Sequence, residues 1–168
     1  MNIDQLNHLS EEEAKTALLR CCGSSRWAAQ MVARRPFTGA PDFLGAAEDI
    51  WNGLSSRDWI EAFSHHPKIG DLDSLREKFA TTRNWAEGEQ VGVKNASEET
   101  LKALAEGNRK YEHKFGFIFI VCATGKSAGE MLAMLNERLA NDLAIELKVA
   151  AAEQNKITRL RLQKLLNE

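Results

Sequence analysis

A histidine precedes a proline at residues 66–70, where a helical pattern ends in the sequence His-Pro-Lys-Ile-Gly. An imidazole titrates near neutrality, with a pKa of about 6.5, so it can both give and take protons in neutral water. Pro67 biases itself and His66 away from helical backbone, which holds the imidazole at a fixed corner. His66 is therefore a candidate catalytic acid/base. The alternative is that it only ends the preceding helix.

A second candidate, Arg161, lies in the last predicted helix. A projection at 3.6 residues per turn places it between Ile157 and Leu165 in an apolar stripe, whereas Arg159 points to another side. A guanidinium aimed into a core needs an anion, because an unpaired buried charge is costly. That anion is either an internal carboxylate or an anionic substrate. A long side chain could also reach the surface.

Two further polar residues, Glu89 and Gln90, fall in the least regular region of the sequence, residues 81–96. A carboxylate next to a carboxamide can hydrogen-bond an amide or urea group. Charged loop residues are more often simply solvated, so this pair alone indicates little.

Metal and nucleotide sites lack their usual spacing in this chain. His65 and His66 are neighbours and cannot easily chelate one ion, and no His-Glu-x-x-His or paired-cysteine motif is present. Glycine-rich phosphate-binding motifs are also missing. The sequence predicts no metal ligands.

The composition favours one protein core and a small-molecule partner. A chain of 168 residues fits one domain, 1–168, and its net charge of -2 gives no basic excess for nucleic acid. No apolar run is long enough for a membrane span, and no targeting signal is evident. The three cysteines lack zinc-ligand spacing and are interpreted as reduced thiols. We therefore expect a cytoplasmic location, without membrane contact.

Apolar residues recur at helical spacing through most of the chain, which predicts an all-α bundle of about eight helices. Ser10 with Glu13 and Ser127 with Glu130 fit the capping box that starts a helix, and Ser55 and Ser97 also precede helical patterns. The expected helices span residues 10–22, 25–34, 42–53, 56–64, 73–80, 98–115, 127–140 and 143–167.

One run departs from helical spacing. Residues 117–121 are aromatic and β-branched, are bounded by Gly116 and Gly125, and have no second run to pair with. We expect a short buried extended segment. Its backbone polar groups need partners, which either neighbouring side chains or a ligand could supply.

Taken together, several motifs resemble the OHCU decarboxylases, the 2-oxo-4-hydroxy-4-carboxy-5-ureidoimidazoline decarboxylase family of urate breakdown. The resemblance extends from about residue 6 to residue 165 and combines His-Pro-x-Ile-Gly with Tyr-x-x-Lys-Phe-Gly-Phe at 111–117. It also includes Trp59-Ile60 through Phe63, Glu89-Gln90, Asn108 and Arg161-Leu162. The resemblance implies an all-helical enzyme that uses no cofactor and decarboxylates the urate-derived intermediate to (S)-allantoin.

The family match also implies roles for individual residues. His66 would be the catalytic acid/base, Glu89 and Gln90 would hold the ureido group, and Arg161 would engage ring oxygens or developing charge. Backbone donors of the extended segment would complete the pocket. The implied substrate-binding residues are Pro67, Gln90, Phe117, Ile118, Phe119, Ile120 and Arg161, with Glu89 placed among the catalytic residues.

One position departs from the family pattern, because Ala86 stands where many members have serine, so any hydroxyl contact there is lost. Two other functions remain open on the sequence alone: a helical binding or adaptor module, and a different helical lyase or mutase acting on a small carboxylate. Apolar faces on the last two helices would permit a homodimer.

Overall fold

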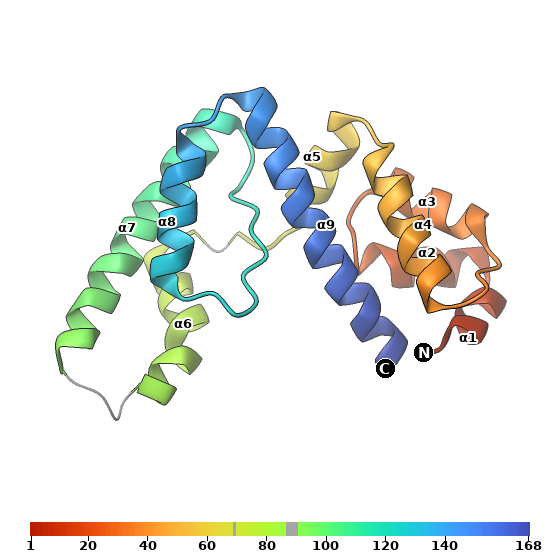
Figure 1. Ribbon diagram of the computed structural model, residues 1–168, viewed down its shortest axis with the longest axis horizontal. Helices are drawn as coiled ribbons and strands as arrows, with labels where there is room; N and C mark the ends of the chain where they lie inside the picture. The colour runs from red at the N-terminus through yellow and green to blue at the C-terminus, as the bar shows by residue number, and fades with distance from the viewer. Residues whose placement is uncertain (69, 87–90) are drawn as a thin grey trace. The chain divides into compact units, whose positions relative to one another are not determined.

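The computed structural model describes residues 1–68, 70–86 and 91–168, with only the backbone described between residues 80 and 97. Within these residues the chain forms nine helices and no strand, so the predicted all-α class is confirmed (Figure 1). None of the described helices is long and apolar enough to span a bilayer. The helices are α1 Ile3–His8, α2 Glu11–Leu19, α3 Ser25–Arg34, α4 Ala40–Asn52, α5 Ser56–Ser64, α6 Leu72–Ala86, α7 Val91–Phe115, α8 Ala128–Leu139 and α9 Leu143–Asn167.

Both predicted capping boxes are present. The hydroxyl of Ser10 accepts from the backbone of Glu13 at the start of α2, and Ser127 does the same with Glu130 at α8. In each case the glutamate reaches back to the capping residue's own N–H. Ser55 caps α5. These starts were predictable because a cap is encoded within four consecutive residues.

One helix was not predicted, and two predictions about helix bounds were wrong. The short helix α1, capped by Asn2, was not expected, since it places only Leu6 in the core. The irregular region predicted at 81–96 is largely helical, because α6 continues to Ala86 and α7 begins at Val91. Ser97 therefore lies inside α7 and does not start it.

The chain divides into two compact units. The first comprises residues 1–66 and 149–168, and therefore holds α1 to α5 and most of α9. Trp27 donates its indole N–H to the carbonyl of Ala47 at 3.0 Å, and Trp51 donates to that of Ala151 at 2.9 Å, which joins α9 to α4. The largest buried side chains of this unit are Leu6, Leu18, Trp27, Met31, Phe43, Trp51 and Phe63.

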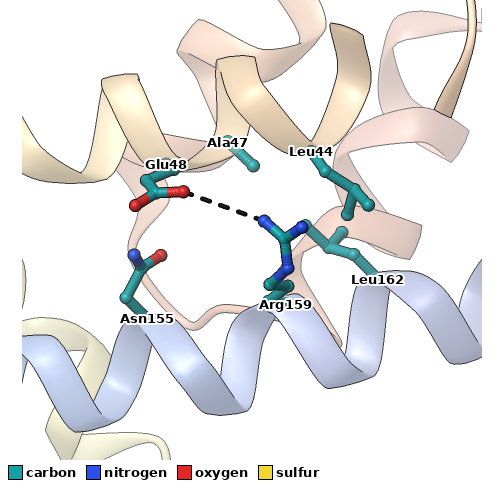
Figure 2. Close-up of a pocket in the computed structure, with 6 residues that line it drawn as sticks. All are labelled: Leu44, Ala47, Glu48, Asn155, Arg159 and Leu162. Carbon is teal, nitrogen blue, oxygen red and sulfur yellow. Dashed lines mark ion pairs between the residues drawn. The ribbon is translucent and has the colours of Figure 1, made fainter. Parts of the chain in front are cut away.

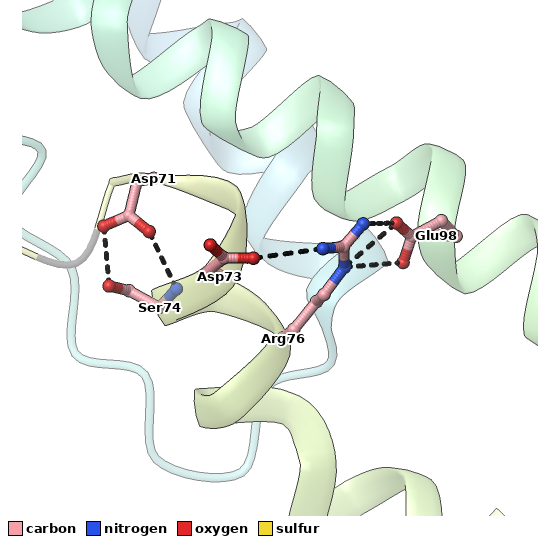
Figure 3. A network of polar contacts seen from close by, with 5 residues as sticks. All are labelled: Asp71, Asp73, Ser74, Arg76 and Glu98. Carbon is pink, nitrogen blue, oxygen red and sulfur yellow. Dashed lines mark hydrogen bonds and ion pairs between the residues drawn. The ribbon is translucent and has the colours of Figure 1, made fainter.

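The second unit comprises residues 67–148, in which α6 and α8 both pack against α7 (Figure 1). Gly107 allows α7 and α8 to approach closely, because an added Cβ would lie 2.5 Å from Cδ2 of Leu135. On the other side of α7, Arg76 of α6 forms an ion pair with Glu98 (Figure 3). Arg76 also contacts Asp73 at 3.1 Å.

The predicted extended segment is confirmed in this second unit. Gly116, with φ of +79°, ends α7, and the chain then runs as neither helix nor strand up to the start of α8. Phe117 and Ile120 are buried, whereas Ile118 and Phe119 are half-buried.

Candidate active site

His66 lies where the sequence predicted, at the corner that follows α5. Its backbone N–H donates to the carbonyl of Phe63 at 3.2 Å, which closes the last turn of that helix. The side chain is half-buried. The imidazole is therefore held on a fixed backbone and remains partly accessible.

The turn between α2 and α3 packs against this corner. At Gly23 an added Cβ would lie 2.4 Å from Cβ of His65, so only glycine permits this approach. Ser25 donates its hydroxyl to Oε1 of Glu61 at 2.7 Å and its backbone N–H to Oε2 at 3.2 Å. These contacts fasten the turn to the end of α5.

A chain of buried polar groups connects His66 to α9 and to the same turn. Nε2 of His66 lies 2.5 Å from Oε1 of Gln154, and Nε2 of Gln154 donates to the hydroxyl of Thr158 at 3.1 Å. Thr158 in turn hydrogen-bonds the thiol of Cys22. We call this set of four side chains the His66 network.

The surroundings of His66 favour its neutral form. Burial lowers the pKa of the imidazole below its usual value, and the electrostatic effects of Arg161 and of the neighbouring His65 lower it further, while the hydrogen bond to Gln154 acts in the opposite direction. A neutral imidazole can accept a proton. By contrast, burial raises the pKa of the Cys21 and Cys22 thiols to about 11, which leaves them protonated and weak as nucleophiles.

Arg161 lies near His66, but the predicted burial of Arg161 was wrong. The buried face of α9 passes through Thr158, Leu162 and Leu165, and Arg161 is exposed beside it. The helical projection centred the apolar stripe one position away from the true buried line, because it could not know which residues α9 packs against. Nη1 of Arg161 approaches the carbonyl of Cys21 at 3.5 Å.

The alternative of an internal salt bridge is not found for Arg161, since no carboxylate of a described residue lies within ion-pair distance of it. Arg159 differs in this respect. It lies 3.8 Å from Glu48 across a small pocket that Asn155 also lines (Figure 2). Of these two arginines, Arg161 is the one available to an anionic ligand.

Five of the other predicted site residues lie outside the unit that holds His66. Pro67, Phe117, Ile118, Phe119 and Ile120 belong to the second unit, and their part in a site with His66 stays a prediction.

The backbone polar groups of residues 118–120 are only partly paired, and their predicted part in a substrate pocket stays a prediction. The carbonyl of Ile120 accepts from Arg138 at 2.6 Å, whereas the N–H groups of residues 118–120 donate to no described residue. Glu89 and Gln90 lie outside the described residues. Lys68, in the His-Pro motif, forms an ion pair with Glu112 at 2.8 Å.

A second buried polar cluster, in the second unit, has a different character. Arg138 of α8 forms an ion pair with Glu146 at 2.6 Å, and Glu146 also accepts from the hydroxyl of Tyr111 and, at 3.0 Å, from Asn141. Arg138 further donates to Tyr111 at 3.2 Å. We call these four side chains the Arg138 cluster.

Sequence reasoning missed Gln154, Thr158 and the Arg138 cluster. Gln154 and Thr158 are four residues apart, so they share one helix face, and both are almost completely buried. A polar pair at this spacing among Ala150, Ala151 and Leu162 was a usable signal. Among the described residues no group of three potential metal ligands comes together.

Comparison with known proteins gives a consistent family. A family model described as OHCU decarboxylase matches residues 7–163. A crystal structure of OHCU decarboxylase in the presence of (S)-allantoin is 40% identical, with a TM-score of 0.71, over 95% of this chain and 100% of that one.

Curated relatives agree. The chain is 42% identical to the uric acid degradation bifunctional protein TTL of Arabidopsis thaliana over 95% of its own residues and 48% of that protein, so it spans about half of this relative. It is 34% identical to 2-oxo-4-hydroxy-4-carboxy-5-ureidoimidazoline decarboxylase of Xenopus laevis, over 83% of this chain and 80% of that one.

Proposed function

Since the chain belongs to the OHCU decarboxylase family, we propose that it is a carboxy-lyase of urate breakdown. Its substrate is 2-oxo-4-hydroxy-4-carboxy-5-ureidoimidazoline, and its products are (S)-allantoin and carbon dioxide. The observation that carries the proposal is the pairing of a half-buried imidazole with an arginine that no described carboxylate neutralises, both in the first unit.

The substrate itself can accept the electrons that decarboxylation releases. Its reacting carbon carries a hydroxyl and a carboxylate beside a ring carbon–nitrogen double bond. When the carbon–carboxylate bond breaks, the electron pair moves into the ring and the nitrogen gains a proton. The hydroxyl proton is then lost and a proton is added at the carbon that bears the ureido group, which leaves a carbonyl. The protein's task is thus positioning and proton transfer on one face.

His66 suits the proton transfer because burial and Arg161 lower its pKa and so favour the neutral form, and a neutral imidazole takes a proton from a hydroxyl. Transfer of that proton to one face of the ring gives a single enantiomer. Arg161 suits the anionic substrate, because its planar guanidinium can make two parallel hydrogen bonds to a carboxylate or to neighbouring ring oxygens.

Further contacts follow from the family match. Glu89 and Gln90 hold the ureido group, and Pro67 lies against the substrate. The N–H groups of residues 118–120 supply hydrogen bonds to substrate oxygens, and their lack of a described acceptor supports this role.

The location and assembly of the chain are also proposals. Its cysteines are free, which supports the reducing cytoplasm. Leu143 and Ile145 expose 54% and 52% of their surfaces at the start of α9, which supports a homodimer that covers them.

The function is tested by forming the labile intermediate from urate in the cuvette and following its decay by ultraviolet absorbance and optical rotation. With the protein present, we expect faster decay and an optically active product that consists of (S)-allantoin alone. An unchanged rate with a racemic product would contradict the proposal and favour the binding-module alternative. Faster decay without allantoin would favour a different lyase.

A further inference from the structure

The carboxamide of Gln154 forms a hydrogen bond with one ring nitrogen of His66. Gln154 is completely buried. Its oxygen meets Nε2 of His66, and its nitrogen meets the hydroxyl of Thr158. Both polar ends of this buried side chain are therefore satisfied. From α9, the amide reaches the corner after α5 and connects two elements of the first unit.

The electrostatics agree with an amide whose oxygen faces the histidine. Arg161, which is positively charged, lies close enough to act on His66 electrostatically. The negative end of the amide dipole is attracted to that side, and the positive end points to Thr158. An oxygen at Nε2 is an acceptor only, so this ring nitrogen must carry the hydrogen.

We infer that Gln154 is a positioning residue that fixes His66 as the Nε2–H tautomer and leaves Nδ1 as the nitrogen that exchanges protons. No hydrogen bond from a described residue reaches Nδ1. The tautomer follows from the contact alone, whereas its catalytic consequence rests on the proposed function. The inference identifies which atom of His66 faces the chemistry.

The same contact also sets how easily His66 can be charged. When Nδ1 takes a proton, the imidazolium keeps its Nε2–H bond to the amide oxygen, which favours the charged form and opposes the effect of burial. Replacement by leucine removes that support, so the imidazole becomes harder to protonate. Replacement by glutamate adds a negative charge and has the opposite effect.

The tautomer is measured directly by long-range proton–nitrogen correlation on the full chain labelled with ¹⁵N-histidine, at a pH where His66 is neutral. The signals of His66 are identified among the four histidines by comparison with His66→Asn. We expect the Nε2–H form to exceed the Nδ1–H form about tenfold, the ratio that one hydrogen bond supports. A wild-type protein with the hydrogen on Nδ1 would overturn the inference without any variant.

The variants test the cause. In Gln154→Leu the tautomer ratio should fall toward that of free histidine, and the acid limb of kcat/KM should move to lower pH. In Gln154→Glu the limb should move to higher pH. Gln163→Leu, an exposed glutamine of the same helix, is the matched control and should change neither.

Two outcomes separate this inference from the proposed function. If Gln154→Leu keeps the wild-type tautomer ratio, and its acid limb of kcat/KM coincides with that of the wild type, Gln154 only fills space and the inference fails. If the tautomer responds as expected but His66→Asn retains full turnover, the inference about the contact stands and the catalytic role of His66 fails.

Discussion

The His66 network and the Arg138 cluster are both buried polar groups in a helical protein, yet they are built differently. In the Arg138 cluster, the cation meets its anion, and Tyr111 and Asn141 satisfy the remaining carboxylate positions. In the His66 network, Nδ1 of the histidine has no described partner, and the nearby Arg161 has no described carboxylate. The first arrangement is complete within the chain, and the second leaves groups available to a ligand.

This difference supports a structural role for the Arg138 cluster and is consistent with the ligand-binding role that we propose for His66 and Arg161. A buried charge must be paired, and a pair that is also fully hydrogen-bonded has no capacity left for a substrate. Tyr111 is likewise fully engaged inside the cluster, because burial and the hydrogen bond to Glu146 raise the pKa of its hydroxyl well above the usual tyrosine value. A charged side chain is therefore more informative about function when its partner is missing.

The largest effect should come from opening the Arg138 cluster. Glu146→Gln removes the anion and leaves a buried guanidinium unpaired, so we expect the free energy of unfolding to fall by about 3–5 kcal/mol in urea titrations. Glu112→Gln is the control, because its ion pair with Lys68 is exposed and should cost less than about 1 kcal/mol. Equal losses of unfolding free energy in the two variants would contradict the distinction between the buried Arg138–Glu146 pair and the exposed Lys68–Glu112 pair.

The next effect concerns the arginine without a described carboxylate. Arg161→Lys keeps the charge but loses the planar two-pronged contact, so kcat/KM should fall about 10- to 100-fold with unchanged stability. Arg159→Lys, whose partner is Glu48, should be nearly silent. The opposite ranking, measured on the same preparation of substrate, would assign the anion site to Arg159.

A smaller effect should follow from moving the corner that carries His66. Gly23→Ala places a methyl group against Cβ and the ring of the His65 side chain, so we expect a loss of about 1–3 kcal/mol in stability and a lower kcat. Gly45→Ala in α4 meets nothing within 4 Å and should stabilise the protein by about 0.5–1 kcal/mol. Full activity in Gly23→Ala would show that the fixed corner is dispensable.

The smallest effect is a shift in pH dependence. The pKa of His66 is lowered by burial first and by Arg161 and His65, so its neutral form persists below the usual value of about 6.5. Activity that needs the neutral form should be lost only as the pH falls through this lowered pKa. Arg161→Gln removes a positive charge, so the acid limb of kcat/KM should move to higher pH, whereas Arg161→Lys should leave it in place. An acid limb unmoved by Arg161→Gln would contradict the electrostatic contact.

Local signals explain how much the sequence could predict. The capping boxes at Ser10 and Ser127 and the corner at His66 are each encoded within a few consecutive residues, and all were predicted correctly. The family was also predicted correctly, because two specific motifs occur together. Burial of Arg161 was predicted wrongly, because the face that α9 buries depends on elements distant in sequence.

The same reason explains what was missed. Gln154 makes its decisive contact with a residue 88 positions away, and the Arg138 cluster joins three separate parts of the chain. Helical periodicity places a polar residue on a face but does not name its partner. The roles of Glu89 and Gln90 stay predictions.

The central claim is that the imidazole of His66 performs the proton transfer, and it is tested most directly by the turnover of His66→Asn. We predict that this variant keeps its helical circular dichroism and loses about 10²- to 10⁴-fold in kcat, together with the enantiomeric excess of the allantoin formed. A folded His66→Asn protein that still yields one enantiomer at the wild-type rate would contradict the account.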